Sequence, residues 1–139
     1  MLPSVKAEGS FWIFLTLLIL ALPLNWVISA LLAAMVHELG HILVLRIYSV
    51  PVHGLRIRAG GAILDTVPME PKAEFLCALA GPVFSFLLLT LVRYFPRISL
   101  CALIQGCFNL LPIGDLDGAR VVKSAFCLMS EKALANREK

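Results

Sequence analysis

The stretch VHELGHILV, Val36–Val44, places two histidines and a glutamate inside an apolar part of the chain. No acidic or basic residue precedes it as far back as Gly9, and apolar residues resume at Ile42–Leu45. An ionisable side chain at membrane depth costs at least about 2.5 kcal/mol on insertion scales, so such residues are functional candidates by default. The three polar side chains therefore need compensating partners, and a bound metal ion is one.

The composition of the 139-residue chain is typical of a membrane protein. Hydrophobic residues make up 60% and charged residues 15%, against roughly 45–50% and about 25% in soluble domains. The net charge of +3 is too small to indicate a nucleic-acid partner. The length favours a single domain over residues 1–139.

Four apolar stretches predict an all-α polytopic membrane protein with about four transmembrane helices. One helix over residues 11–47 would be about 55 Å long, too long for a crossing of about 30 Å, and Pro23 provides a break. The first stretch is short, but no small-residue cleavage site follows it, so we expect it to be retained. The predicted helices cover residues 11–22, 26–47, 75–92 and 98–113.

The segments outside these stretches have a mixed character. Residues 49–71 alternate polar and apolar side chains and contain Gly60-Gly61, which predicts a small β-hairpin at the cytoplasmic surface between the second and third helices. Gly81-Pro82 is expected to kink the third helix and to let other helices approach closely. Residues 118–136 mix apolar and charged side chains, which predicts a C-terminal surface helix.

The basic residues indicate the orientation in the membrane. With four crossings and a cytoplasmic N-terminus, Arg93 and Arg97 lie outside the cell. The cytoplasmic side then holds Lys6, Arg46, Arg56, Arg58, Lys72, Arg120, Lys123, Lys132, Arg137 and Lys139. This imbalance predicts a multi-pass protein of the cell membrane, surrounded by the lipid bilayer.

The spacing inside VHELGHILV suits a metal site. His37 and His41 stack on one face of a helix and can bind one Zn²⁺, while Glu38 can reach a water on that ion. The alternative, polar residues that satisfy one another, is weakened by the apolar surroundings. His41 lies five residues before Arg46, about 7.5 Å of helix. We therefore expect one Zn²⁺ per chain, near the cytoplasmic side.

A catalytic zinc site needs a third protein ligand and an open position. His53 is the third histidine, but it lies in the predicted hairpin. Asp115 and Asp117 follow the fourth apolar stretch in N-L-L-P-I-G-D-L-D-G, where Pro112 and Gly114 interrupt the helix. Non-helical chain at membrane depth is tolerated where it is buried in protein or lines a wet cavity. The residues alone favour the two aspartates without deciding between them.

Three ordered motifs resemble those of the site-2 protease family of intramembrane zinc metalloproteases. They are H-E-L-G-H, A-G-P at Ala80–Pro82, and N-L-L-P-x-x-x-L-D-G at Asn109–Gly118. Without an inserted PDZ domain, residues 10–125 are most similar to the branch that contains stage IV sporulation protein FB. The resemblance implies hydrolysis of a peptide bond in or near the transmembrane segment of a membrane-bound protein, by zinc-activated water.

The resemblance also implies the roles of residues at the site. His37, His41 and Asp117 match the three metal ligands, and Glu38 matches the catalytic glutamate, a general base and then acid. Asp115 falls where the family often has proline, which leaves it a supporting or surface role.

Further residues match or depart from the family pattern. Asn109 matches the asparagine of the N-x-x-P motif, and Ser85 stands where an asparagine commonly follows A-G-P. Together with Gly81 and Pro82, these two are candidates for substrate binding or for support of the site.

Two other functions remain as alternatives. One is a catalytically silent membrane scaffold of the same fold, which binds helices. The other is a metal carrier or channel, which would need acidic or histidine residues on more helices than this chain offers. The chain ends soon after the third motif, without extra helices or a nucleotide-sensing domain, so we expect regulation to come from a separate membrane partner.

Overall fold

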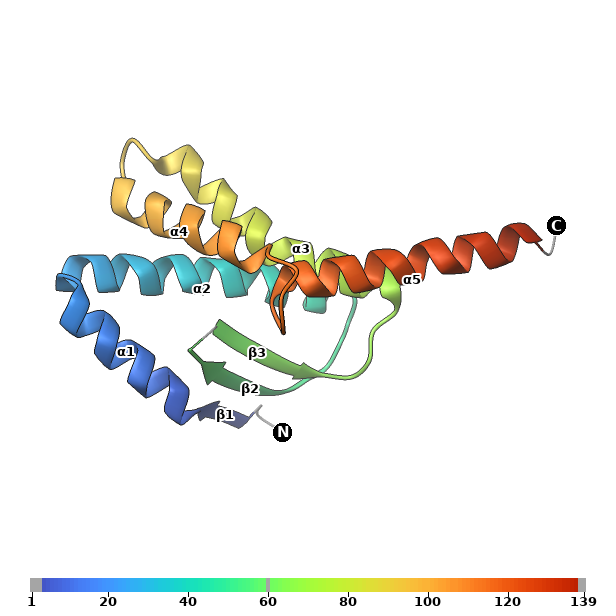
Figure 1. Ribbon diagram of the computed structural model, residues 1–139, viewed down its shortest axis with the longest axis horizontal. Coiled ribbons are helices and arrows are strands. Elements are labelled where there is room, and N and C mark those ends of the chain that lie inside the picture. Colours follow the sequence, from blue (N-terminus) through green and yellow to red (C-terminus); the bar gives the residue numbers. More distant parts are fainter. Residues whose placement is uncertain (1–3, 60, 138–139) are drawn as a thin grey trace.

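The computed structural model describes residues 4–59 and 61–137, so Gly60 and Lys139, named above, lie outside the described residues. The chain is mostly helical with a small sheet (Figure 1). Its elements are β1 (Ser4–Ala7), α1 (Gly9–Ala21), α2 (Leu24–Ile47), β2 (Val52–Arg58), β3 (Gly61–Thr66), α3 (Pro71–Leu87), the 3₁₀ turn η1 (Leu88–Leu91), α4 (Pro96–Asn109) and α5 (Asp117–Arg137).

The helix bounds follow breakers in the sequence. Pro23 separates α1 from α2, and Pro71 and Pro96 open α3 and α4, where the missing N–H of proline is not needed. After α2, Ser49 takes a left-handed conformation (φ 53°), and the Val50 N–H donates to the Leu45 carbonyl. This pairing satisfies a carbonyl that the end of the helix leaves free.

The third and fourth helices differ in detail from the prediction. α3 begins at Pro71, four residues before the predicted start, and it continues through Pro82 as one α-helix. α4 ends at Asn109, four residues before the predicted end. The segment 110–116 is therefore a connection of turns, and it leads directly into Asp117.

Two of the described helices are long and apolar enough to cross a membrane: α2, and α3 continued by η1, over Pro71–Leu91. α1 has 13 residues and α4 has 14, which makes each about 20 Å long, less than the hydrocarbon core of about 30 Å. None of the described residues of α1 is buried. The arrangement with four crossings stays a prediction.

The small sheet has the strand order β1-β2-β3. β2 and β3 form the antiparallel hairpin that the sequence predicted within residues 49–71. β1 was not predicted: it pairs in parallel with β2 and places Lys6 opposite Arg56. The N-terminal segment therefore lies beside the hairpin, which agrees with the prediction that both lie on one side of the membrane.

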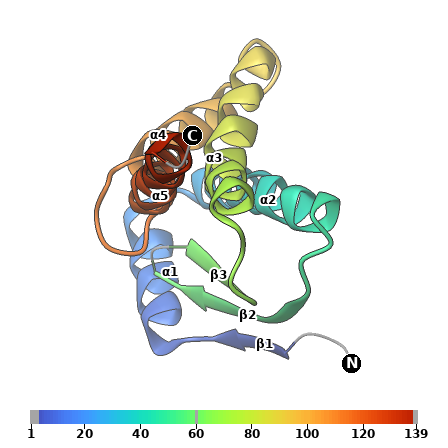
Figure 2. The ribbon, with the colours of Figure 1, turned by 90° about the vertical axis from the view of Figure 1, so that its right-hand side faces the viewer.

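Helices α3 and α4 pack on one side of α2, and α1 and the sheet lie on the other (Figure 1). Figures 1 and 2 show α3 and α4 above α2, the sheet below it, and α5 extending past the body. Small residues allow the helices to approach closely. A Cβ atom on Gly40 of α2 would lie 2.5 Å from the Ala80 carbonyl oxygen of α3. This close contact fixes α2 against the helix that supports its histidines.

Candidate metal centre

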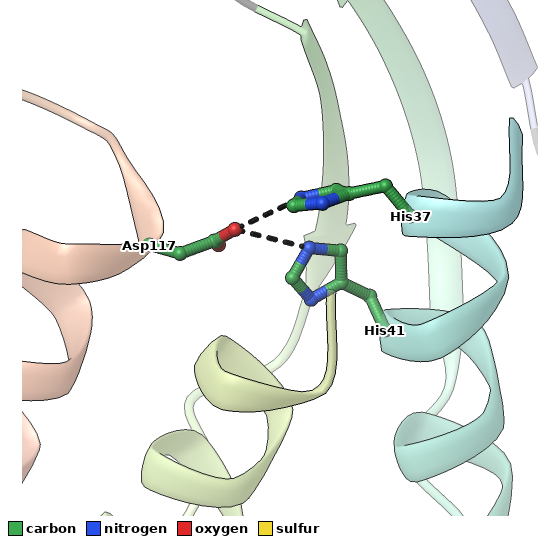
Figure 3. A group of neighbouring side chains, drawn as sticks. All are labelled: His37, His41 and Asp117. Atoms are coloured by element: carbon green, nitrogen blue, oxygen red, sulfur yellow. Dashed lines mark hydrogen bonds and ion pairs between the residues drawn. The ribbon is translucent and has the colours of Figure 1, made fainter. Parts of the chain in front are cut away.

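His37 and His41 of α2 and Asp117 at the start of α5 converge in the structure (Figure 3). The Asp117 Oδ2 atom lies 3.1 Å from His37 Nε2 and 3.3 Å from His41 Nε2. The three side chains are buried, and one ligand atom from each lies within 4.8 Å of the others. The fold thus brings together three residues that belong to two motifs far apart in the sequence.

Hydrogen bonds orient both imidazole rings toward Asp117. His41 Nδ1 lies 2.8 Å from the Cys77 carbonyl oxygen, and His37 Nδ1 lies 2.9 Å from Ser85 Oγ. A carbonyl oxygen only accepts, so His41 Nδ1 donates and its Nε2 keeps a free lone pair in the neutral ring. Metal-binding histidines are held in this way, by a partner on the other ring nitrogen.

Two glycines of the sequence motifs provide room for this arrangement. A Cβ atom on Gly81 would overlap the Nε2 atoms of both histidines, so α3 can pass the two rings only with glycine here. A Cβ atom on Gly118 would overlap the Leu110 carbonyl oxygen, so α5 can begin against the end of α4 only with glycine here. Both close approaches bring Asp117 and the histidines to one point.

The donor set fits a catalytic zinc site. Two imidazole nitrogens and one carboxylate oxygen are ligands that Zn²⁺ prefers, and three protein ligands leave a position open for water or substrate. The three side chains are buried, and the Nδ1 atoms of both histidines already have partners on the side away from Asp117. The role of these three residues as zinc ligands remains a prediction.

A cavity of about 1090 Å³ opens beside the cluster. His37, Glu38 and His41 line it from α2, and strand β3 lines it from the sheet. Glu38 is half-buried, and a Cβ atom on Gly61, at the start of β3, would lie 4.0 Å from Glu38 Oε1. The hairpin therefore forms part of the cavity wall as well as part of the surface, which its sequence pattern did not reveal.

The predicted support residues divide into two groups. Asn109 lines the cavity, and its Nδ2 atom lies 3.4 Å from His37 Nε2. Ser85, Gly81 and Pro82 are buried and are absent from the described cavity lining. Ser85 contacts His37, so the geometry favours support of the ring over contact with a substrate.

The other two candidate ligands lie apart from the cluster. The Asp115 side chain is 79% exposed, and its Oδ2 atom lies 3.1 Å from Arg58 Nη2. His53 is exposed on β2. Neither residue belongs to the group of described side chains that could hold a metal ion.

Sequence reasoning missed two charged residues beside the cluster. Arg120 Nε donates to Glu74 Oε1 at 2.8 Å, and Arg120 Nη1 lies 3.5 Å from Asp117 Oδ1. Burial opposes the charge of the guanidinium, but the hydrogen bond to Glu74 raises the pKa of Arg120. Arg120 stands one helical turn after Asp117, a spacing that could have identified it. Glu74 lies on α3, and only the fold places it there.

Two comparisons with known proteins show what this chain is similar to. Its fold is similar to that of the site-2 protease from Methanocaldococcus jannaschii, with a TM-score of 0.70 and 24% sequence identity over 91% of this chain and 69% of that one. Its sequence is similar to zinc metalloprotease MJ0392 of the same organism, with 29% identity over an alignment of 154 residues. No protein-family model matches the chain.

The sequence alignment covers 96% of this chain and 42% of the relative, so the chain spans less than half of that protein's length. The chain is therefore similar to these proteases in fold and in sequence.

Proposed function

We propose that the chain is an intramembrane zinc metalloendopeptidase. The observation that carries this proposal is the convergence of His37, His41 and Asp117 on a cavity that Glu38 also lines. The two histidines and Glu38 lie on α2, a helix apolar enough to cross a membrane. His37, His41 and Asp117 would hold one Zn²⁺. When bound, the ion acidifies water and polarises a peptide carbonyl.

The residues of the chain then have distinct roles. Glu38 accepts a proton from the attacking water and passes it to the leaving amine. Ser85 and the Cys77 carbonyl keep the two imidazoles facing Asp117. Asn109 presents an amide donor at the cavity wall, where it can hydrogen-bond a substrate carbonyl oxygen.

The substrate is a membrane-bound protein that unwinds locally before cleavage. A helix hides its peptide bonds in internal hydrogen bonds, whereas an extended segment exposes them. β3 is suited to an extended substrate because it is an edge strand of the described sheet and lines the cavity. An extended chain can pair with such an edge by strand addition. Helix-breaking residues near the cytoplasmic face should therefore promote cleavage in a reconstituted substrate, and indifference to their removal would contradict this.

The proposed topology has four crossings, with the N-terminus, the hairpin and the site toward the cytoplasm. The pairing of β1 with β2 supports a common side for Lys6 and Arg56. The two short helices would cross with help from their flanks or a locally thin bilayer. Single-cysteine labelling in a variant without native cysteines tests this: a cysteine at position 93 should react from outside, and one at position 132 from inside.

The substitution Glu38→Gln separates a protease from a silent scaffold. Wild type and variant are each co-expressed with candidate membrane proteins, and fragments are analysed by mass spectrometry. A protease keeps about one zinc per chain in the variant and loses cleavage, while Glu131→Gln, on an exposed part of α5, keeps both. Cleavage that persists in Glu38→Gln would contradict the proposed role of this glutamate.

A further inference from the structure

The two carboxylate oxygens of Asp117 face different groups. Oδ2 points at both histidines, at 3.1 and 3.3 Å from their Nε2 atoms. Oδ1 points instead at Arg120, with 3.5 Å to Nη1. This separation is at the limit for a hydrogen bond, so the contact acts mainly as an ion pair. A carboxylate held in this way offers one oxygen to the cluster and keeps the other away from it.

Arg120 is itself fixed by a residue of another helix. Its Nε atom donates to Glu74 Oε1 at 2.8 Å, and both side chains are about one-third exposed, at 36% and 30%. Glu74 and Cys77 are three residues apart, so they share one face of α3. The same face thus holds His41, through the Cys77 carbonyl, and reaches Asp117 through Glu74 and Arg120.

We propose that Arg120, anchored by Glu74, is a positioning residue that holds Asp117 with one oxygen directed at the metal. A guanidinium suits this role because its planar, permanently charged fork can hold two carboxylates at once. The inference rests on the proposed function, since it requires Zn²⁺ at the cluster. The competing explanation is that the Glu74–Arg120 pair only joins α3 to α5 and has no effect on Asp117.

The affinity for zinc separates these explanations. It is measured by competition with a chelator, in purified protein, for wild type, Arg120→Met, Glu74→Met and the double variant. Loss of a residue that orients a ligand typically weakens metal binding by about 10–100-fold, and we expect a loss of this size for Arg120→Met. The double variant should remain as weak as Arg120→Met, because Asp117 still lacks its partner.

Two control variants test whether the effect is specific to the guanidinium of Arg120. Arg93→Met makes the same replacement at an exposed position after η1 and should bind zinc like wild type. Arg120→Lys keeps the positive charge but loses the fork, and it should bind zinc more weakly than wild type and more tightly than Arg120→Met. The absorption spectrum of bound Co²⁺ should also change in Arg120→Met, because a freed carboxylate can bind through both oxygens.

Each outcome bears on a different claim. Zinc affinity and cobalt spectra that match wild type in Arg120→Met would overturn this inference and leave the proposed function standing. Recovery of affinity in the double variant would also overturn it, because that result is expected of a purely structural ion pair. A wild-type chain that binds no zinc would overturn the proposed function, and this inference with it.

Discussion

Two aspartates of one short segment have opposite surroundings. The Asp117 side chain is 9% exposed and faces two buried histidines, while the Asp115 side chain is 79% exposed and faces Arg58 at the rim of the cavity. They differ because Asp117 begins α5, and Gly118 lets that helix start against the backbone of Leu110. Depth within the fold, rather than residue type, therefore separates the two aspartates.

The largest difference should be between substitutions of the two aspartates. Asp117→Asn replaces a charged ligand by a neutral one and should reduce zinc binding at least 100-fold, with complete loss of cleavage. Asp115→Asn should change zinc affinity less than twofold, because its partner is an exposed arginine. Zinc content after dialysis against a chelator measures the loss of binding in each variant. Equal losses would contradict the assignment of Asp117, rather than Asp115, to the metal site.

The next effect concerns the space around the histidines. Gly81→Ala places a methyl group against both rings and should destabilise the fold by about 1–3 kcal/mol, as overpacking of a core does. It should also weaken zinc binding, because the rings must move. Gly9→Ala is the matched control, since nothing lies within 4 Å of a Cβ atom at that position. Denaturation in detergent compares them, and an unperturbed Gly81→Ala would contradict the packing described.

Ser85→Ala removes the partner of His37 Nδ1 without adding bulk. Ser85 is fully buried, so the ring nitrogen is left unsatisfied at a cost of about 1–3 kcal/mol. Zinc affinity should fall by about tenfold, in the range known for residues that orient a ligand. Ser130→Ala, at an exposed position of α5, is the control. If Ser85 instead contacted substrate, the variant would keep its zinc affinity and raise KM.

The smallest effect is expected for the exposed ion pair between Arg56 and Asp65 on the sheet. Arg56 hydrogen-bonds Asp65 and lowers the pKa of that carboxyl. Because the folded pKa lies below the unfolded value, the stabilisation is present above the unfolded pKa and is lost as pH falls through the folded pKa. Exposed pairs are worth little, so Asp65→Asn should lower the melting temperature only slightly at pH 7. This difference should vanish in acid, and a difference that grows as pH falls would contradict the pairing.

The sequence predicted much of this fold because its signals are local. Helices are specified by the long charge-free stretches and by the break at Pro23. The hairpin is specified by the alternation of polar and apolar residues within residues 49–71. The spacing of His37 and His41 likewise places both on one helical face. These features depend on neighbours along the chain, which a sequence displays directly.

The remainder depended on contacts between distant segments. β1 is too short to be recognised before its pairing with β2 is known, and the hairpin belongs to the cavity wall because the fold places β3 across the cavity from α2. Asp117 was distinguished from Asp115 by resemblance to a family, not by the residues themselves. The roles of Ser85 and Glu74 required α3 to be placed beside α2 and α5.

The proposed function requires His37, His41 and Asp117 to hold one zinc ion together. X-ray absorption at the zinc edge of the purified protein tests it most directly. We expect one zinc per chain, nitrogen and oxygen neighbours at about 2.0–2.2 Å, and scattering from two imidazoles, reduced to background in Asp117→Asn. A sulfur neighbour at about 2.3 Å, which would implicate a cysteine such as Cys77, or zinc retained without Asp117 would contradict the account.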